Sequence, residues 1–109
     1  MSRLIFSKAV DQDISSSIKY IKNMLEAPVA SKRLSDELEE IYLKLEENPH
    51  RRPLVNNKFL AMKGYRSINV KNYKLFYKII EEDNSVLLVR FMYGKRDWAT
   101  ILMGEFEED

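Results

Sequence analysis

Lysine and arginine residues recur along the second half of the chain, where they alternate with aromatic and β-branched residues. Residues 64–80 predict two strands joined by a tight turn at Lys71 and Asn72, because such alternation is typical of half-buried strands. With a two-residue turn, Lys74, Phe76 and Lys78 share one face of this hairpin. Cations around an aromatic ring suit contacts to phosphates and stacking of bases. The first chemistry to consider is therefore the binding of a nucleic acid.

The register of the strand hairpin decides which other side chains share a face. A two-residue turn pairs Val70 with Tyr73 and Arg66 with Tyr77, and it directs the apolar Ile68 away from the cationic face. A bulge or a longer turn would move Arg66 to the other face of the sheet. Both orientations of Arg66 therefore stay open from the sequence.

The net charge of +1 conceals an uneven distribution along the chain. Residues 1–48 hold seven Lys/Arg and nine Asp/Glu, which gives −2, whereas residues 49–104 hold eleven Lys/Arg and four Asp/Glu, which gives +7. A basic strand half is expected of a surface that meets a polyanion, although lysines also protect sheet edges. The four acids of residues 105–109 are interpreted as a solubilising end, or as a screen over the basic face until a partner displaces it.

Two helices are predicted before these strands, after a short strand at residues 3–7. Ser7 suits the N-cap of the first helix. The buried face of that helix is predicted from apolar residues at spacings of three and four. These residues are Val10, Ile14, Ile18, Ile21 and Leu25, with Tyr20 and Met24 widening the face. Residues 26–28 break the helix at a proline.

A second helix is predicted over residues 29–47, antiparallel to the first. Its apolar stripe comprises Ala30, Leu34, Leu38, Ile41 and Leu45. Asn48 and Pro49 end the helix, and residues 50–59 are interpreted as a linker without periodicity. Residues 86–93 are apolar on both faces and are predicted to be the most enclosed strand. Residues 99–103 suit a short helix, with Trp98 expected to cap the end of the core.

The order of these elements predicts an α+β fold, β-α-α-β-β-β with a short C-terminal helix. The helical hairpin is expected on one side of a small antiparallel sheet. At 109 residues, the chain is expected to form one domain over residues 1–104, followed by the acidic tail 105–109.

Composition excludes or disfavours several kinds of site. The chain has no cysteine, so disulfides and thiolate zinc sites are ruled out. The single histidine, His50, falls in the linker and is interpreted as a solvated loop residue. No metal cluster, glycine-rich phosphate loop or catalytic triad is recognisable, so neither a metal nor another cofactor is expected. No apolar run approaches the roughly 18 residues that span a bilayer, and no signal peptide is recognisable, which predicts a cytoplasmic protein.

Three motifs together resemble one known family. Gly64-Tyr65-Arg66, the tyrosine-flanked residues 73–78 and the Gly-Lys-Arg-Asp of residues 94–97 follow a helical hairpin that ends at Asn-Pro. At these spacings they resemble the RelE/ParE family of bacterial toxins, and the similarity extends over nearly the whole chain in element order. The resemblance implies the toxin of a type II toxin–antitoxin module in the bacterial cytosol. It also implies neutralisation by a small cognate antitoxin that wraps the sheet and helices.

RelE-like members of this family cleave mRNA in the ribosomal A site with a cluster of basic residues. The resemblance to them implies catalytic roles for Arg66, Lys74 and Arg96. Such cations can hold the phosphate, stabilise the charge that develops on it and protonate the leaving oxygen, while the 2′-hydroxyl of the RNA attacks. Five further residues are the expected nucleic-acid contacts: Lys71, Lys78, Arg90, Tyr93 and Lys95.

This sequence departs from the RelE pattern in two respects. The tyrosine that RelE carries shortly after the last-strand arginine is absent, since residues 100–102 are Thr-Ile-Leu. Lys74 replaces an arginine and cannot make the same planar two-point contact. ParE-like members instead inhibit DNA gyrase without a nuclease centre, and the long helical hairpin resembles theirs at least as closely. Ribosome-dependent mRNA cleavage is the first expectation, gyrase inhibition the alternative, and an inactive toxin fold that only binds a partner the third.

Overall fold

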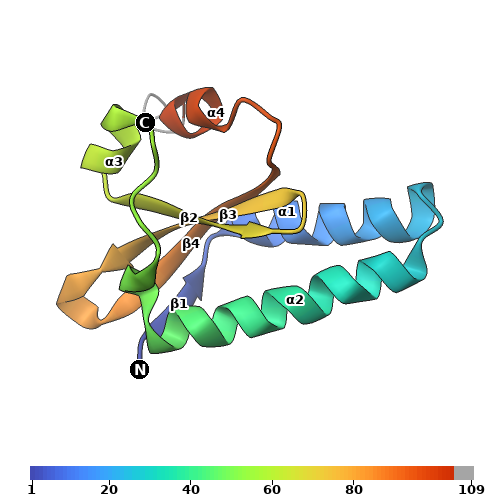
Figure 1. The fold of residues 1–109 in the computed structure, drawn as a ribbon, viewed down its shortest axis with the longest axis horizontal. Helices are drawn as coiled ribbons and strands as arrows, with labels where there is room; N and C mark the ends of the chain where they lie inside the picture. The colour runs from blue at the N-terminus through green and yellow to red at the C-terminus, as the bar shows by residue number, and fades with distance from the viewer. Residues whose placement is uncertain (105–109) are drawn as a thin grey trace.

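Two long helices lie beside a four-stranded sheet in the computed structural model, which describes residues 1–104 (Figure 1). The first helix, α1 (Lys8–Lys19), begins where the Ser7 hydroxyl accepts a hydrogen bond of 2.9 Å from the Val10 amide, which confirms the predicted N-cap. The second, α2 (Pro28–Glu47), has proline at its first position, where the missing N–H leaves no gap in the helix. The two helices form the predicted hairpin (Figure 1).

The face of α2 that meets the sheet is the predicted apolar stripe, with one difference at its start. Four of the five predicted residues are buried: Leu34, Leu38, Ile41 and Leu45. Ala30 is exposed, and Ser31 is buried in its place. The Ser31 hydroxyl donates to the Ile18 carbonyl oxygen of α1 (3.2 Å), so this buried polar group has a partner and joins the two helices.

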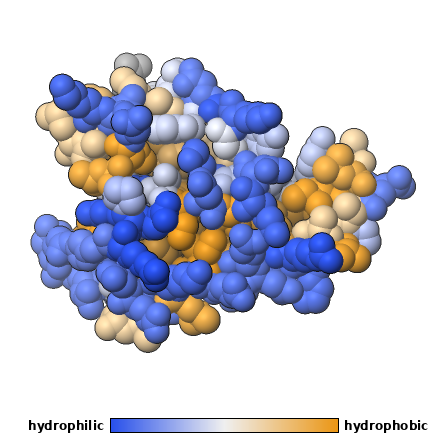
Figure 2. Space-filling model, viewed as in Figure 1, coloured by the Kyte–Doolittle hydropathy of each residue, from blue (hydrophilic) through white to orange (hydrophobic). Residues whose placement is uncertain are grey.

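The free end of the helical hairpin differs from the prediction. α1 passes into a π-helical turn (Tyr20–Met24), which adds a residue to the turn and shifts the side chains that follow. Tyr20, Met24 and Leu25 lie in or directly after this turn, and they are not buried but 52%, 73% and 55% exposed. Glu26 adopts a left-handed backbone (φ +49°) where the chain reverses. We refer to residues 20–29 as the hairpin tip, and Figure 2 shows apolar surface gathered there with hydrophilic side chains around it.

The sheet has the strand order β1–β4–β3–β2. β2 (Tyr65–Val70), β3 (Tyr73–Ile80) and β4 (Ser85–Tyr93) are consecutive and antiparallel, as predicted. β1 (Arg3–Phe6) pairs parallel with the first half of β4. Six of the nine residues of β4 are buried, against three of eight in β3, which confirms the prediction that it is the most enclosed strand.

The turn between β2 and β3 is the predicted two-residue turn. Val70 pairs with Tyr73, and Lys71 takes the left-handed backbone (φ +57°) that such hairpin turns require. The pairing continues without a shift along the whole of β2, so the register predicted for this hairpin is confirmed.

The orientation of Arg66 follows from this register. Arg66 pairs with Tyr77, whose side chain is buried beneath the helical hairpin, and paired residues point to the same face. A register shift between Phe76 and Tyr77 lies in the β3–β4 ladder, so it leaves Arg66 in place. Arg66 therefore lies on the face that the helical hairpin covers.

An apolar core lies on each face of the sheet. On one face the helical hairpin covers Leu75, which is 0% exposed, and its neighbours. On the other face α3 (Lys58–Met62) and α4 (Trp98–Gly104) cover Phe76, and Leu102 of α4 packs in the same core; both side chains are 0% exposed. Successive residues of β3 thus contribute to opposite cores, as the alternation of a strand requires.

The second core corrects the prediction for Phe76. Its ring lies under Trp98, with 5.2 Å between ring centroids, and it is not displayed between Lys74 and Lys78 on an open surface. Trp98 packs against this core, in keeping with the prediction that it caps the core. The short C-terminal helix predicted at residues 99–103 is confirmed as α4, but its position over this face was not predicted. α3 was missed because five residues are too few to show a helical period.

The segment predicted as a linker also contains regular structure. A 3₁₀ turn (Pro49–Arg51) follows α2, and α3 begins where the Asn57 side chain accepts a hydrogen bond of 3.0 Å from the Leu60 amide. Within residues 1–104, no helix combines the length and the apolar character needed to cross a membrane. The two interpretations of the acidic tail concern residues 105–109, which lie outside the described part of the chain.

Candidate functional site

The turn that follows β4 docks against the β2–β3 turn. The Gly94 amide donates to the Asn72 carbonyl oxygen (2.7 Å). A Cβ at Gly94 would lie 3.1 Å from that oxygen, so glycine permits the close approach. Lys74 lies next to Gly94, and the Arg96 amide bonds back to the Tyr93 carbonyl oxygen (3.0 Å). Backbone contacts therefore hold the residues after β4 at this end of the sheet.

Arg96 lines a cavity of about 480 Å³ between α1 and the end of β4, which we name the Arg96 cavity. Aromatic rings form part of its wall. Tyr73 stacks on Phe91, with centroids 4.8 Å apart, and meets Tyr93 edge-on at 5.9 Å. The side of the cavity formed by α1 and the start of the π-helical turn is more polar: Asp13, Ser16, Ser17 and Tyr20. One cation beside tyrosine rings and hydroxyls can hold a planar ring and a phosphate.

Arg90 is held in an ion pair with α1. Its Nε and Nη2 atoms donate to the two carboxylate oxygens of Asp13 at 2.6 and 3.0 Å, and the Phe91 amide donates to the same carboxylate at 2.9 Å. The two charged side chains are only 18% and 17% exposed. These bonds attach α1 to β4 beyond the point where β1 ends. The predicted contact of Arg90 with nucleic acid would therefore have to break a largely buried pair.

Asp13 is the structurally important residue that the sequence did not reveal. It stands among polar residues of a helix and is separated from Arg90 by 77 positions, so no local pattern links the two. The available signal was weak: an arginine within an otherwise apolar strand requires a partner once it is buried.

Arg66 lies far from the Arg96 cavity in the sheet, near the start of the edge strand β2. Its guanidinium donates to the carbonyl oxygen of Arg52, and residue 54 forms an isolated bridge with Arg66. Burial raises the pKa of Tyr77, and the nearby Arg66 and Arg52 cations oppose that rise. These contacts show Arg66 fastening the segment before α3 to the edge of the sheet.

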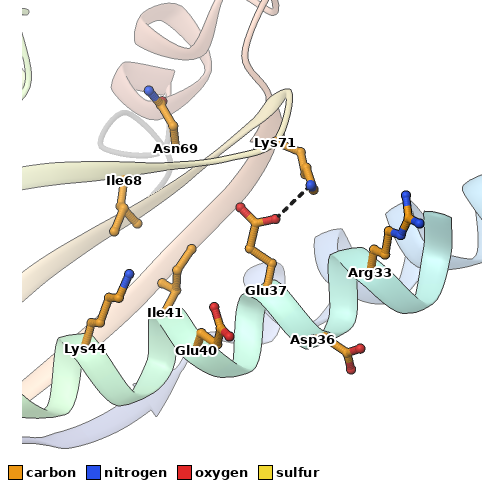
Figure 3. A pocket seen from close by; sticks show the side chains of 9 residues that line it. All are labelled: Arg33, Asp36, Glu37, Glu40, Ile41, Lys44, Ile68, Asn69 and Lys71. Carbon is orange, nitrogen blue, oxygen red and sulfur yellow. Dashed lines mark ion pairs between the residues drawn. The ribbon is translucent and has the colours of Figure 1, made fainter. Parts of the chain in front are cut away.

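Lys71 faces α2 across a groove of about 380 Å³ (Figure 3). Its Nζ lies 3.3 Å from a carboxylate oxygen of Glu37, as the dashed line in Figure 3 marks. Asp36 and Glu40 also line the groove, together with Arg33 and Lys44. Such mixed charge does not favour a polyanion here. Of the other predicted contacts, Lys78 lies over the Tyr65 ring (5.2 Å) and Lys95 is exposed.

The three predicted catalytic residues do not form one cluster. Lys74 pairs with Asn69 and donates to its side chain (2.9 Å), and Asn69 is three positions from Arg66 along β2. An odd separation along a strand places Arg66 and Lys74 on opposite faces of the sheet. Arg96 lines the Arg96 cavity, whose lining does not include the other two. The expected convergence into one cationic pocket is therefore not found.

No metal site accompanies these residues in the described chain. Among residues 1–104, no three His, Asp or Glu side chains lie close enough together to hold a metal ion. His50 is exposed in the 3₁₀ turn, and its Nε2 lies 2.7 Å from a carboxylate oxygen of Glu81.

The chain is similar in structure to solved toxins and toxin–antitoxin complexes. The chromosomal ParDE system of P. aeruginosa aligns with a TM-score of 0.67 and 10% identity, over 85% of this chain and 96% of that one. The intact E. coli RelBE complex gives a TM-score of 0.56 and 14% identity over 88% and 100% of the two chains. The isolated E. coli RelE toxin gives 0.56 and 13% over 97% and 99%. At such identities these similarities establish the α+β fold of RelE and ParE toxins.

A family model matches most of the sequence, although the pairwise identities to the solved structures are low. The model of the ParE toxin of type II toxin–antitoxin systems (parDE) matches residues 4–98. The chain therefore belongs to the ParE toxin family, within the RelE/ParE group of toxins. No curated protein sequence matches the chain.

Proposed function

We propose that this toxin arrests growth by binding a protein target, and that the target is DNA gyrase, as the resemblance to ParE-like toxins implies. The observation that carries this proposal is the placement of Arg66, Lys74 and Arg96 on different surfaces. Acid–base chemistry on one phosphodiester requires its groups within hydrogen-bond reach of the same atoms. Side chains on opposite faces of a sheet do not meet that requirement.

The pairing of other cations supports the same proposal. Arg90 is neutralised by Asp13, and Lys71 lies against Glu37. A toxin that held mRNA would present such groups to phosphates. Here their contacts stabilise the fold, which suits a toxin whose surface recognises another protein.

Cleavage of mRNA on the ribosome is the second candidate, because the Arg96 cavity brings Arg96 together with Tyr93 and Tyr73. In that case Arg96 stabilises the charge on the phosphate and a tyrosine ring stacks on a base. This role needs neither Arg66 nor Lys74.

Induced expression with pulse labelling distinguishes the two candidates. For the gyrase proposal we expect DNA synthesis to fall first, with filamentous cells and intact mRNA, and purified toxin to inhibit supercoiling by gyrase. Early loss of methionine incorporation, with mRNA cut at A-site codons, would overturn it. In that case Arg96→Ala should abolish the cuts, whereas Lys58→Ala, at an exposed cation of α3, should leave them.

A further inference from the structure

The hairpin tip exposes four large apolar side chains within ten residues. Tyr20, Met24, Leu25 and Val29 are 52%, 73%, 55% and 65% exposed. Figure 2 shows apolar surface at the end of the molecule that the hairpin tip forms. Apolar side chains that gather on a surface, with polar residues around them, mark an interaction site more often than scattered ones do.

The charges around the hairpin tip are mostly positive. Lys19, Lys22 and Arg33 are exposed there, while Glu26 is the acid within residues 20–29. Lys32 differs from these cations because Asp36 lies 3.2 Å from its Nζ. The partner that complements this surface therefore offers apolar side chains with carboxylates around them.

The backbone of the hairpin tip is irregular in two independent ways. A π-helical turn follows α1, and such turns are frequent at functional sites. Glu26 has φ +49°, a conformation that is strained for a residue other than glycine. Strain of this kind persists only where the surrounding structure enforces it, and it clusters at functional sites. Met24 and Leu25, both exposed, lie within and directly after the π-helical turn.

The hairpin tip also projects beyond the sheet (Figure 1), and an apolar groove of about 310 Å³ runs beside it, lined by residues that include Leu25, Ala30 and Tyr73. A surface that projects in this way is complementary in shape to a concave surface on its partner. We propose that the hairpin tip inserts into an apolar, acidic cleft of the protein that the toxin inhibits. This inference rests on the proposed function and assigns target recognition to residues 20–29.

Two other occupants fit the tip less well. Two copies of this chain meeting tip to tip would bring Lys19, Lys22 and Arg33 against the same cations, which opposes a symmetric contact. The antitoxin that the resemblance implies wraps the sheet and helices, whereas the tip projects beyond the sheet (Figure 1). The inference therefore commits to the target.

The test is a pair of substitutions that make the tip acidic, Met24→Glu with Leu25→Glu. We expect this variant to lose growth arrest on induction, with at least a tenfold gain in surviving colonies, and to lose inhibition of gyrase supercoiling. It should still co-purify with the antitoxin encoded beside it, and its circular dichroism should match that of the wild type. The matched control is Leu43→Glu, which changes an equally exposed apolar residue (61%) of α2 outside the tip and should stay toxic.

Three results would overturn the inference. The tip variant could arrest growth as the wild type does. It could remain toxic but escape neutralisation, which assigns the tip to the antitoxin. The wild type could be a dimer that the tip substitutions dissociate, which assigns the tip to a second copy. The proposed function fails separately: a wild-type toxin that cuts mRNA without inhibiting gyrase refutes gyrase as the target, while the growth assay still reports on the tip.

Discussion

At the scale of single residues, the contact that most constrains this toxin is the pair of Asp13 and Arg90. The Asp13 carboxylate accepts hydrogen bonds from both the Arg90 guanidinium and the Phe91 amide. This one side chain therefore covers the edge of β4 beyond the point where β1 ends. An open strand edge would otherwise offer itself to another chain. The pair therefore gives a structural reason for Arg90 within β4, a residue that the sequence predicted to contact nucleic acid.

Replacing Asp13 by alanine is expected to lower the free energy of unfolding by about 2–4 kcal/mol, because Arg90 and the Phe91 amide lose their acceptor while largely buried. Urea unfolding at pH 7 measures this loss. The control is Asp36→Ala, which removes an ion pair whose side chains are 77% and 64% exposed and should cost less than about 0.5 kcal/mol. Equal losses for the two variants would contradict a structural role for the buried pair.

Tyr42 gives the fold a dependence on alkaline pH. Burial raises the pKa of Tyr42 to about 12, and the Glu39 and Asp11 carboxylates add to the rise. In the unfolded chain the pKa of a tyrosine is about 10, so above that pH the unfolded state loses the proton first. Stability is expected to be unaffected by this group below pH 10 and to fall as the pH rises from about 10 to about 12.

Tyr42→Phe should remove this contribution, so its urea midpoint is expected to fall less between pH 8 and pH 11 than that of the wild type. Tyr20→Phe, which changes an exposed tyrosine of the same helical hairpin, serves as the control. If the urea midpoints of the wild type and Tyr42→Phe fell equally between pH 8 and pH 11, groups other than Tyr42 would govern stability at alkaline pH.

At the scale of elements, the helices and the three long strands could be predicted because their signals are local. Leu34 and Leu38 repeat at a helical period, and the alternation around Lys71 and Asn72 defined a register that the structure confirms. The hairpin tip could not be predicted. A π-helical turn adds one residue to the period, and residues 20–24 carry no mark of it.

The candidate site was less accessible from the sequence than the fold. Charge distribution showed that the strands are basic, but not whether their cations meet. That depends on the parity of residues on separate strands, which separates Arg66 from Lys74, and on distant partners such as Asp13. It depends too on α3 and α4, whose five and seven residues are too few to reveal a buried face.

α4 is expected to depend on one buried anchor, because a helix of seven residues is unstable alone. Leu102 is 0% exposed, and Leu102→Ala should release α4 and shift the Trp98 fluorescence to longer wavelength as that ring meets water. The neighbouring Met103, 37% exposed, provides the control, and Met103→Ala should leave the spectrum unchanged. An unshifted spectrum in Leu102→Ala would show that Trp98 itself holds the helix.

At the scale of the whole molecule, the two cores share one sheet. Leu75 and Tyr77 of β3 belong to the core under the helical hairpin, whereas Phe76 between them belongs to the core under α3 and α4. If β3 detaches, the side chains of both cores become exposed at the same time. The described chain should therefore unfold as one cooperative unit.

Leu38→Ala tests this coupling, because Leu38 lies in the hairpin core and Trp98 reports on the opposite one. We expect the substitution to cost about 2–5 kcal/mol and to move the Trp98 fluorescence transition and the helical circular dichroism transition by the same amount. Separate midpoints for the two signals would show that the cores unfold independently.

The pairing of β1 with β4 has a consequence for how this toxin comes into being. The ribosome makes β1 before the other strands and β4 after them, yet β4 supplies the hydrogen bonds that β1 needs. Completing the sheet must await the emergence of β4, since contacts between distant segments form late. The complete sheet, and with it both apolar cores, is therefore expected only when most of the chain has left the ribosome.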